Sequence, residues 1–261
     1  GQMCIRDRIN PNIETMYIKP VPRRSIPSIV RFADISLNTE HETIKLIAKE
    51  ARKQKKVHKI IIMVEMGDLR EGVLGKDLIN FYAKIFKLKG IEVIGIGTNL
   101  NCFHGVMPSH DKLVQLALYK QIIELRFNKT LRWVSGGTTV ALPLIPRKQL
   151  PKSINHFRIG EALFFGADLF SKKTLKGMFP NVFELFAEII EISEKPTVPI
   201  GELDVNPSGE MFEINEKDYG KESYRALVDI GILDVNHRFL TPTDPDTVSY
   251  THLTLPTKRI V

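Results

Sequence analysis

The chain has 261 residues, enough for one large domain or two modest ones, and its 43% hydrophobic and 26% charged residues are typical of a soluble globular protein. No run reaches the ~18 apolar residues of a membrane helix. The two cysteines, Cys4 and Cys102, provide no disulfide framework, so we expect a cytoplasmic protein without a signal peptide. The net charge of +7 is concentrated in part at 49–59, where no aromatic residues are interleaved, which argues against a nucleic-acid partner.

Both ends of the chain look foreign to the rest of it. GQMCIRDR (1–8) and VSYTHLTLPTKRIV (248–261) show no helical or strand period and resemble translated sequencing-adapter read-through from metagenomic assemblies. We therefore expect a non-native leader at 1–10 and a non-native tail at 247–261, around a fragment of a longer protein.

From Thr15 onward, short apolar runs rich in Ile and Val alternate with longer segments of helical period. The first predicted helix has Asn38 or Thr39 as its N-cap. Nearly continuous apolar strands bounded by helices indicate a parallel sheet covered on both faces. The predicted strands are 15–19, 34–38, 59–66, 92–97, 131–136 and 156–160, and the predicted helices are 40–55, 76–88 and 111–127.

Polar residues at the strand ends decide between two architectures for these six β/α units, a doubly wound sheet and most of a TIM barrel. Asp68 with Arg70, Thr98 with Asn99, and the stretches that follow the last two strands all lie at or just past strand ends. Polar residues at the ends of so many successive strands are typical of a barrel. The G-x-G-x-x-G motif of a dinucleotide-binding doubly wound sheet is absent. We predict an α/β chain with a partial TIM (β/α)8 barrel, about six of eight units, at 11–183, and the start of a β-rich C-terminal domain at 184–246.

Two of these strand ends suit an anion. Residues 134–140 read VSGGTTV, which alone is typical of an ordinary turn but offers bare backbone and hydroxyls to a ligand. The next strand end, NHFRIGEALFFG (155–166), places Arg158 between Phe157 and Ile159. A buried arginine there needs an acceptor, so surface charge alone is the weaker interpretation.

Together with ADISLNTEHETIKLI (33–47), MVEMGDLREGV (63–73) and GIGTNLNC (95–102), these stretches resemble the alanine racemase-like family of fold-type III pyridoxal 5'-phosphate (PLP) proteins. Within that family they look like ornithine racemase and its close relatives. The resemblance covers roughly 15–245. It implies PLP as cofactor, an amino acid as substrate and a homodimer for the full-length protein, with no membrane partner.

The resemblance also implies roles for single residues. Arg158 would face the pyridine nitrogen of the cofactor. Arg70 would approach its phenolic oxygen and the substrate carboxylate, unless it is a loop arginine paired with Asp68 or Glu71. Asn99 stands where alanine racemase has a histidine beside the ring, so its catalytic role rests on position alone. The cofactor phosphate is assigned to Ser135, Gly136, Gly137, Thr138, Thr139, Gly160 and Glu161.

Two catalytic groups of the family cannot be placed. The Schiff-base lysine ends the first barrel strand, whereas TMYIK corresponds by motif order to the third, so Lys19 is not taken as that lysine. Tyr219 and Tyr224 are candidates for the base on the opposite face, but neither has a matching motif. Cys102 and His104 have no partners at zinc spacing, so we predict no metal.

The predicted function is PLP-dependent amino-acid racemisation, by removal and return of the Cα proton, with ornithine as the first substrate and Glu65, Glu71 or Glu161 as unranked partners for its terminal amine. Lacking the lysine and part of the barrel, the 261-residue chain is expected to be inactive and prone to aggregate. One alternative is a non-catalytic PLP-homeostasis protein of the same fold, against which 184–245 argues. The other is a TIM-barrel lyase or aldolase that binds a phosphorylated substrate, which would not require Arg158 at a ring nitrogen.

Overall fold

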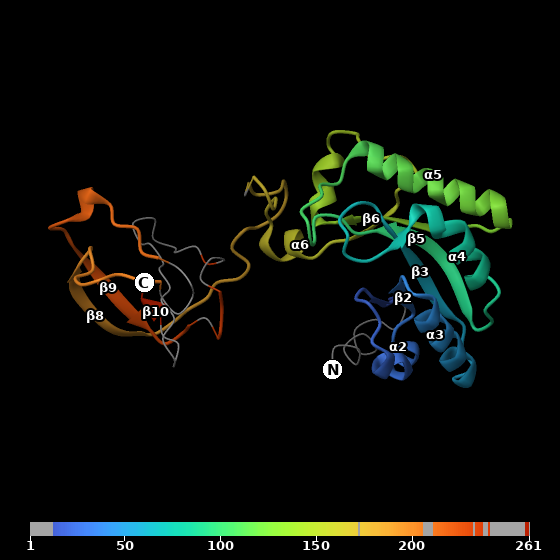
Figure 1. Ribbon diagram of the computed structural model, residues 1–261, viewed down its shortest axis with the longest axis horizontal. Coiled ribbons are helices and arrows are strands. Elements are labelled where there is room, and N and C mark those ends of the chain that lie inside the picture. The colour runs from blue at the N-terminus through green and yellow to red at the C-terminus, as the bar shows by residue number, and fades with distance from the viewer. Residues whose placement is uncertain are drawn as a thin grey trace. The chain divides into compact units, whose positions relative to one another are not determined.

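Two compact units divide the chain, Gly1–Phe183 and Glu184–Val261, and each is described by itself (Figure 1). The expected leader at 1–10 lies outside the described residues, and so does the expected tail apart from the backbone of its residues 259 and 260. The computed structural model describes residues 13–171, 173–205, 211–231, 233–236, 240 and 259–260.

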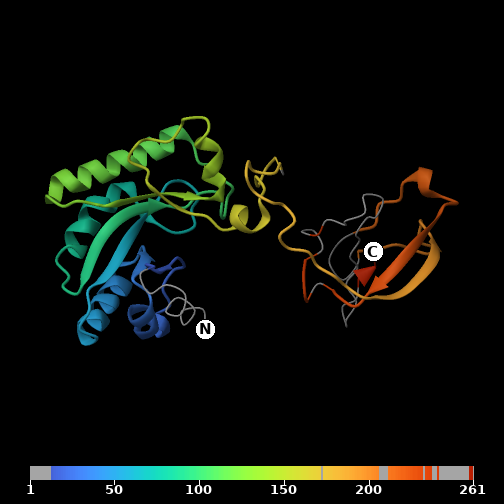
Figure 2. The same cartoon turned by 180° about the vertical axis from the view of Figure 1, so that it is seen from behind.

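The first unit is built on one parallel sheet whose main strands follow the order β1-β2-β3-β5-β6-β7, with β4 paired to β3. A doubly wound sheet reverses its strand order at a switch point, but here the order follows the chain throughout. Figures 1 and 2 show the sheet curling as it progresses, so the predicted partial TIM barrel is confirmed. The strands are Met16–Tyr17 (β1), Ile35–Asn38 (β2), His58–Glu65 (β3), Val73–Leu74 (β4), Ile91–Thr98 (β5), Trp133–Thr138 (β6) and His156–Arg158 (β7).

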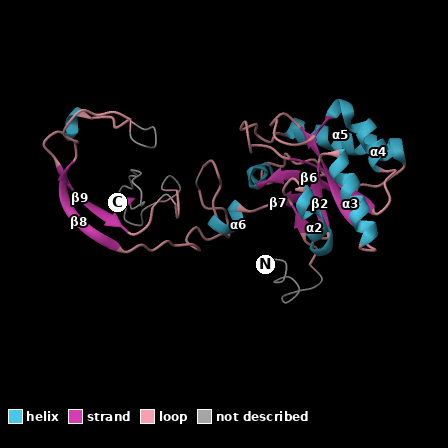
Figure 3. Ribbon diagram, turned by 60° about the horizontal axis from the view of Figure 1, so that its bottom comes forward, coloured by secondary structure: helices cyan, strands magenta, loops and turns pink. Residues whose placement is uncertain are grey.

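Helices alternate with these strands, and Figure 3 shows α3, α4 and α5 along the same face of the sheet. None of the helices in the described part of the chain is long and apolar enough to cross a membrane. The helices are Ile26–Phe32 (α2), His41–Lys53 (α3), Leu78–Ile85 (α4), His110–Phe127 (α5) and Glu161–Phe165 (α6), with short 3-10 turns at Arg23–Ser25, Gly75–Asp77 and Thr139–Leu144.

Strand β3 contributes to two separate cores because successive side chains of a strand point to opposite faces. Ile60, Ile62 and Val64 pack in the larger core with residues of α4 and α5, while Ile61 and Met63 pack in a smaller core on the other face. The apolar run of β3 is nearly continuous because both faces are buried, as predicted for a parallel sheet. The smaller core is completed by Ile35, Leu37 and Ile94.

The predicted strands and helices of the first unit are confirmed, with ends that differ by at most three residues. Two short helices were missed, α2 and α6. α2 spans seven residues and begins Ile26-Pro27, and α6 spans five residues. Segments this short hold too few turns for a hydrophobic period to be recognised.

The N-cap of α3 is Glu40, so the expectation of Asn38 or Thr39 was wrong. Glu40 Oε1 accepts the amide of Glu42 at 2.7 Å, and Oε2 accepts the amide of Thr43 at 2.6 Å and its hydroxyl at 2.7 Å. Asn38 instead ends β2 and turns its side chain back to Ser36. Glutamate is outside the usual set of N-cap residues, which is why sequence reasoning passed over it.

Replacing Glu40 by alanine should lower the free energy of unfolding by about 1 kcal/mol, because two amides at the start of α3 lose their acceptor. Urea unfolding followed by the helical circular dichroism signal measures this loss. Glu42→Ala is the matched control, since Glu42 lies in the same turn but contacts His41 and Lys45 through its side chain. Equal losses in the two variants would contradict the capping role.

The second unit contains an antiparallel sheet in the order β10-β9-β8. Its strands β8 and β9 pair along their length, from Ile189 opposite Val228 to Pro196 opposite Glu222. The predicted β-rich segment after the barrel is therefore confirmed. The elements are Ile189–Pro196 (β8), Glu216–Asp218 (η4, a 3-10 turn), Glu222–Val228 (β9) and Arg259–Ile260 (β10).

Candidate active site

The polar residues singled out from the sequence lie at one edge of the parallel sheet. β3 ends at Glu65, β5 at Thr98, β6 at Thr138 and β7 at Arg158. These strands are parallel neighbours, so their carboxyl ends meet at the same edge. In a barrel this edge is where the functional residues gather.

Arg158 is anchored at this edge by acceptors from neighbouring strands. Its Nη1 donates to the Ser135 hydroxyl, and its Nη2 donates to the Thr98 carbonyl oxygen at 2.9 Å and to Asn99 Oδ1 at 3.4 Å. Burial lowers the pKa of Arg158 to about 10, although the nearby Glu71 carboxylate opposes this shift. The side chain is half-buried, and the guanidinium is still cationic at neutral pH.

The Ser135 hydroxyl that accepts from this guanidinium is also in contact with His156. Ser135 is fully buried, and its hydroxyl oxygen lies 2.9 Å from His156 Nδ1. Burial, reinforced by the charge of Arg158, lowers the pKa of His156, so the ring is neutral at pH 7. Ser135 Oγ accepts a hydrogen bond from Arg158, which leaves its own hydroxyl proton free for donation to Nδ1. The ring of His156 also stacks on Trp133, with 4.8 Å between centroids.

Asn99 connects Arg158 to Glu71 and Arg70. Asn99 Nδ2 donates to Glu71 Oε1 at 3.2 Å, while its Oδ1 accepts from Arg158 and, at 3.4 Å, from Cys102 Sγ. Glu71 Oε2 lies 2.8 Å from Arg70 Nε, and the Arg70 side chain is 41% exposed. The structure thus brings together the three residues predicted for catalysis, and Glu71 joins them.

Asp68 organises the loop after β5, a role that the sequence did not reveal. Its side chain is fully buried and accepts four main-chain amides, from Cys102 and Phe103 at 2.9 Å, from Val106 at 3.1 Å and from His104 at 3.2 Å. Burial by itself raises the pKa of Asp68, but the amide hydrogen bonds outweigh it and leave the pKa below its usual value. The Asp68 carboxylate is thus occupied by main-chain amides of this loop. Arg70 pairs with Glu71 instead.

Asp68→Asn should remove one acid-sensitive component of stability. A depressed carboxyl pKa contributes stability above the unfolded value of about 3.9, and that stability is lost as pH falls through the lower folded pKa. The wild-type free energy of unfolding should therefore fall below about pH 4, whereas the variant should be less stable at pH 7 and change less on acidification. Urea titrations between about pH 3 and 7 measure both slopes, with the exposed Asp77→Asn as control. Parallel curves for Asp68→Asn and wild type would contradict this role.

Glycines near the end of β6 and just after β7 leave room for an anion. Gly137 has a φ of +130°, and a Cβ there would lie 3.6 Å from Ala141, whereas a Cβ at Gly160 would meet no atom within 4 Å. Gly136 differs, because a Cβ there would lie 2.5 Å from Ile154 Cγ2, so internal packing explains that glycine. Gly160 is the N-cap of α6, whose first amides have no acceptor within the helix.

The hydroxyls near these glycines divide into two kinds. Thr139 Oγ1 is buried and accepts the Ala162 amide at 3.4 Å, which ties the turn after β6 to the start of α6. Thr138 is half-buried and lies opposite Arg158 in the strand register, while Glu161 is exposed. Open glycine backbone, the amide of Glu161 and one half-buried hydroxyl make a donor set that fits a phosphate such as that of PLP.

The model of the alanine racemase N-terminal domain family matches residues 7–168. The chain belongs to this family. It is 39% identical over 220 residues to ornithine racemase of Acetoanaerobium sticklandii, covering 84% of this chain and 62% of that relative. It is 32% identical over 215 residues to lysine racemase of Thermotoga maritima, covering 82% of this chain and 59% of that one. The chain thus spans about three fifths of the length of these curated relatives.

Solved structures share the fold of this racemase-family chain. Alanine racemase of Clostridium difficile superposes with a TM-score of 0.59 at 13% identity, covering 99% of this chain and 66% of that one. PipY of Synechococcus elongatus, solved with PLP bound, gives a TM-score of 0.52 at 13% identity, covering 62% of this chain and 75% of that one. At this level of identity the likeness concerns the fold alone.

The remaining sequence candidates are His104 in the first unit and two tyrosines in the second. His104 Nδ1 lies 2.9 Å from the Asp68 carbonyl oxygen, and the residues that the structure describes contain no group of three or more His, Cys, Asp or Glu placed to hold a metal. Tyr219 and Tyr224 belong to the second unit and are 61% and 75% exposed.

Proposed function

We propose that this chain forms the cofactor-binding part of a PLP-dependent amino-acid racemase, with ornithine as the first substrate. The observation that carries the proposal is the half-buried, cationic Arg158, held by Thr98, Asn99 and Ser135 beside open glycine backbone. The similarity to ornithine and lysine racemases supports the substrate class, because both of those amino acids carry a side-chain amine. That the full-length enzyme is a homodimer belongs to the same proposal.

The phosphate of PLP would be held by the backbone at Gly137 and Gly160, the amide of Glu161 and the hydroxyl of Thr138. Arg158 would meet the pyridine ring. When bound, PLP supplies an electron sink that makes the Cα proton of an amino acid acidic. A guanidinium has donors only and remains charged, so Arg158 would keep the ring nitrogen opposite it unprotonated. A weaker electron sink favours return of the proton over loss of the amino group.

Arg70 would hold the substrate carboxylate. Its side chain is partly exposed and is oriented by Glu71, which Asn99 holds in turn. Since Asn99 also accepts from Arg158, the group that binds substrate and the group that faces the cofactor ring share one support. Asn99 acts in this proposal as a positioning residue.

The alternatives from the sequence receive less support. A non-catalytic PLP-binding protein would not require the second unit with its β8–β9 sheet. A lyase or aldolase that binds a sugar phosphate could use the glycines, but it would have no need for the network that Ser135 and Asn99 build around Arg158.

Pyridoxamine 5'-phosphate, which cannot bond covalently to a lysine, tests the phosphate site directly. We expect the chain to bind it at least about tenfold more tightly than pyridoxamine, because the phosphate contributes charge-assisted hydrogen bonds. Gly137→Val should weaken binding about tenfold by filling the space and straining a φ of +130°. Fluorescence titration gives both dissociation constants.

Gly177→Val is the matched control for this experiment. Gly177 also has a positive φ, +84°, and a Cβ there would meet no atom within 4 Å. Equal affinities for the two pyridoxamine compounds, or equal effects of the two substitutions, would remove Gly137 from the proposed phosphate site.

Lys19 should not be the lysine that bonds to PLP. It is exposed and follows β1, and the strand order places β2, β3 and β5 between β1 and β6. We expect borohydride reduction of the 261-residue chain with PLP to give no stoichiometric label at Lys19, and no racemisation of D- or L-ornithine. Peptide mapping and chiral chromatography measure the two outcomes. One labelled lysine per chain at Lys19, together with racemisation, would overturn this assignment.

A further inference from the structure

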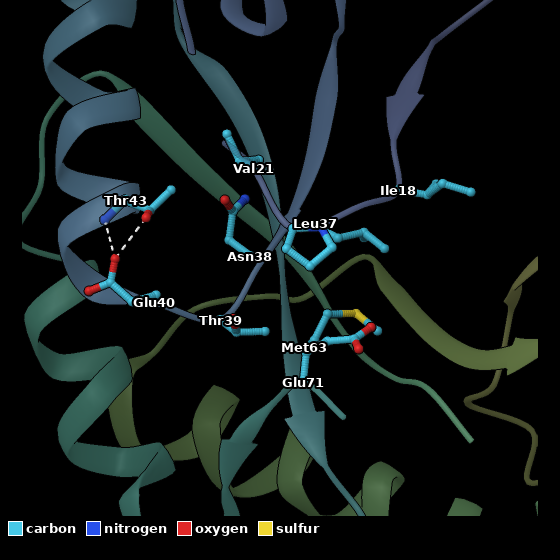
Figure 4. Close-up of a pocket in the computed structure, with 10 residues that line it drawn as sticks. Ile18, Val21, Leu37, Asn38, Thr39, Glu40, Thr43, Met63 and Glu71 are labelled. Carbon is cyan, nitrogen blue, oxygen red and sulfur yellow. Dashed lines mark hydrogen bonds between the residues drawn. The ribbon is translucent and has the colours of Figure 1, made fainter. Parts of the chain in front are cut away.

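A pocket of about 80 Å³ lies where β2 and β3 end, and it shares Glu71 with the candidate active site (Figure 4). Its walls include the apolar side chains of Val21, Leu37 and Met63 and the polar side chains of Asn38, Glu40 and Glu71. Figure 4 shows the Asn38 amide and the Glu71 carboxylate approaching it from different strands and loops.

Asn38 lines this pocket, and its side chain carries a hydrogen-bond acceptor that has no partner among the described residues. Its side chain is only 4% exposed, and its Nδ2 donates to the Ser36 carbonyl oxygen at 3.0 Å and to Ser36 Oγ at 2.9 Å. Ser36 Oγ in turn lies 2.9 Å from Nε2 of His58, a ring that burial keeps neutral by lowering its pKa to about 4. These hydrogen bonds from His58 through Ser36 fix the orientation of the Asn38 amide. Its Oδ1 is buried and has no hydrogen-bond partner among the described residues.

A buried carbonyl without a donor is costly unless a ligand supplies one. The charge around Asn38 indicates which kind of ligand that is. Two carboxylates, Glu40 and Glu71, line the pocket, and the described residues that line it include no lysine, arginine or histidine. Both carboxylate oxygens of Glu40 accept main-chain amides at the start of α3. Glu71 instead accepts a hydrogen bond from a side chain, that of Asn99. The pocket thus favours a ligand that donates hydrogen bonds, and a cationic ligand there would share the Glu71 carboxylate with Arg70.

We propose that this pocket binds the side-chain ammonium of a diamino acid, with Asn38 Oδ1 and Glu71 as its acceptors and Val21, Leu37 and Met63 around its methylene groups. The inference rests on the proposed function and deepens it, because it identifies the residues that select ornithine or lysine over a neutral amino acid. An ammonium has three donors and no acceptor, which matches a site whose buried side-chain atoms without a hydrogen-bond partner among the described residues include the Asn38 carbonyl oxygen and a Glu71 carboxylate oxygen.

The other two glutamates considered from the sequence do not meet these requirements. Glu65 Oε1 accepts the amides of Gly67 and Leu69 within its own turn, and Glu161 is exposed at the start of α6. Neither residue lines the pocket. Glu71 is therefore the carboxylate that the structure selects.

The test uses n-propylammonium chloride, a probe with the terminal amine and methylenes of ornithine but no α-amino acid group, so it needs neither PLP nor catalysis. The chain is labelled with [methyl-13C]methionine, and the Met63 methyl signal, assigned through Met63→Leu, reports on the pocket. We expect a saturable shift of that signal with n-propylammonium and none with n-propanol at the same concentrations. A Met63 signal that n-propylammonium leaves unchanged, or that n-propanol shifts equally, would overturn the proposal.

Asn38→Leu should weaken n-propylammonium binding about tenfold, because a bond to a charged donor is lost. Asn38→Asp, which keeps an acceptor at this place and adds charge, should bind at least as tightly as the wild type. Asn80→Leu on the exposed side of α4 is the control and should change nothing. Equal affinities in the wild type and Asn38→Leu would exclude Asn38 as an acceptor.

Glu71→Gln keeps the test decisive if Asn38→Leu fails to fold, as judged by its circular dichroism melt. The glutamine variant should also bind n-propylammonium about tenfold more weakly, and unchanged binding would contradict the assignment of Glu71. Failure of this pocket is distinguishable from failure of the proposed function. Pyridoxamine 5'-phosphate binding with no response to n-propylammonium rejects the pocket alone, and the reverse result rejects the cofactor site alone.

Discussion

A guanidinium removed from water must find acceptors, and at Arg158 this requirement connects three strands. The acceptors are the carbonyl oxygen of Thr98 at the end of β5, Asn99 just beyond it, and Ser135 on β6. They lie close together because β5, β6 and β7 are parallel neighbours whose register brings their carboxyl ends to one edge. A shift of one residue in either pairing would turn Ser135 or Arg158 to the other face of the sheet. The barrel register and the candidate site therefore depend on the same contacts.

Carboxylates near the strand ends serve two purposes, and the difference explains where charge remains available. Glu40, Glu65 and Asp68 accept main-chain amides, and so they shape the start of α3, the turn after β3 and the loop after β5. These three carboxylates therefore stabilise the nearby backbone by accepting its amides. Glu71 instead contacts the side chains of Asn99 and Arg70, which leaves it in a position to influence a ligand.

The inner face of the sheet contributes to both folding and recognition. Leu37 and Met63 belong to the smaller core, because alternation along β2 and β3 turns them away from the outer helices, and the same two residues wall the acceptor-lined pocket. The core that closes the inside of a partial barrel thus continues into the proposed binding site. Substitutions at these two positions would affect stability and ligand preference together.

The sequence by itself determined the order and type of the main elements and the edge at which function collects. Apolar runs and helical periods are local properties, and the polar residues that follow each strand, from Arg70 to Arg158, could be read without knowing which strands pair. Its motifs also indicated the racemase family. Only the tertiary structure decided the N-cap at Glu40, the use of the Ser135 hydroxyl to hold Arg158, the four amides around Asp68 and the unpaired oxygen of Asn38. Most of these depend on which groups meet across strands and loops tens of residues apart, and the N-cap depends on the angle at which the chain enters α3, so no local pattern records them.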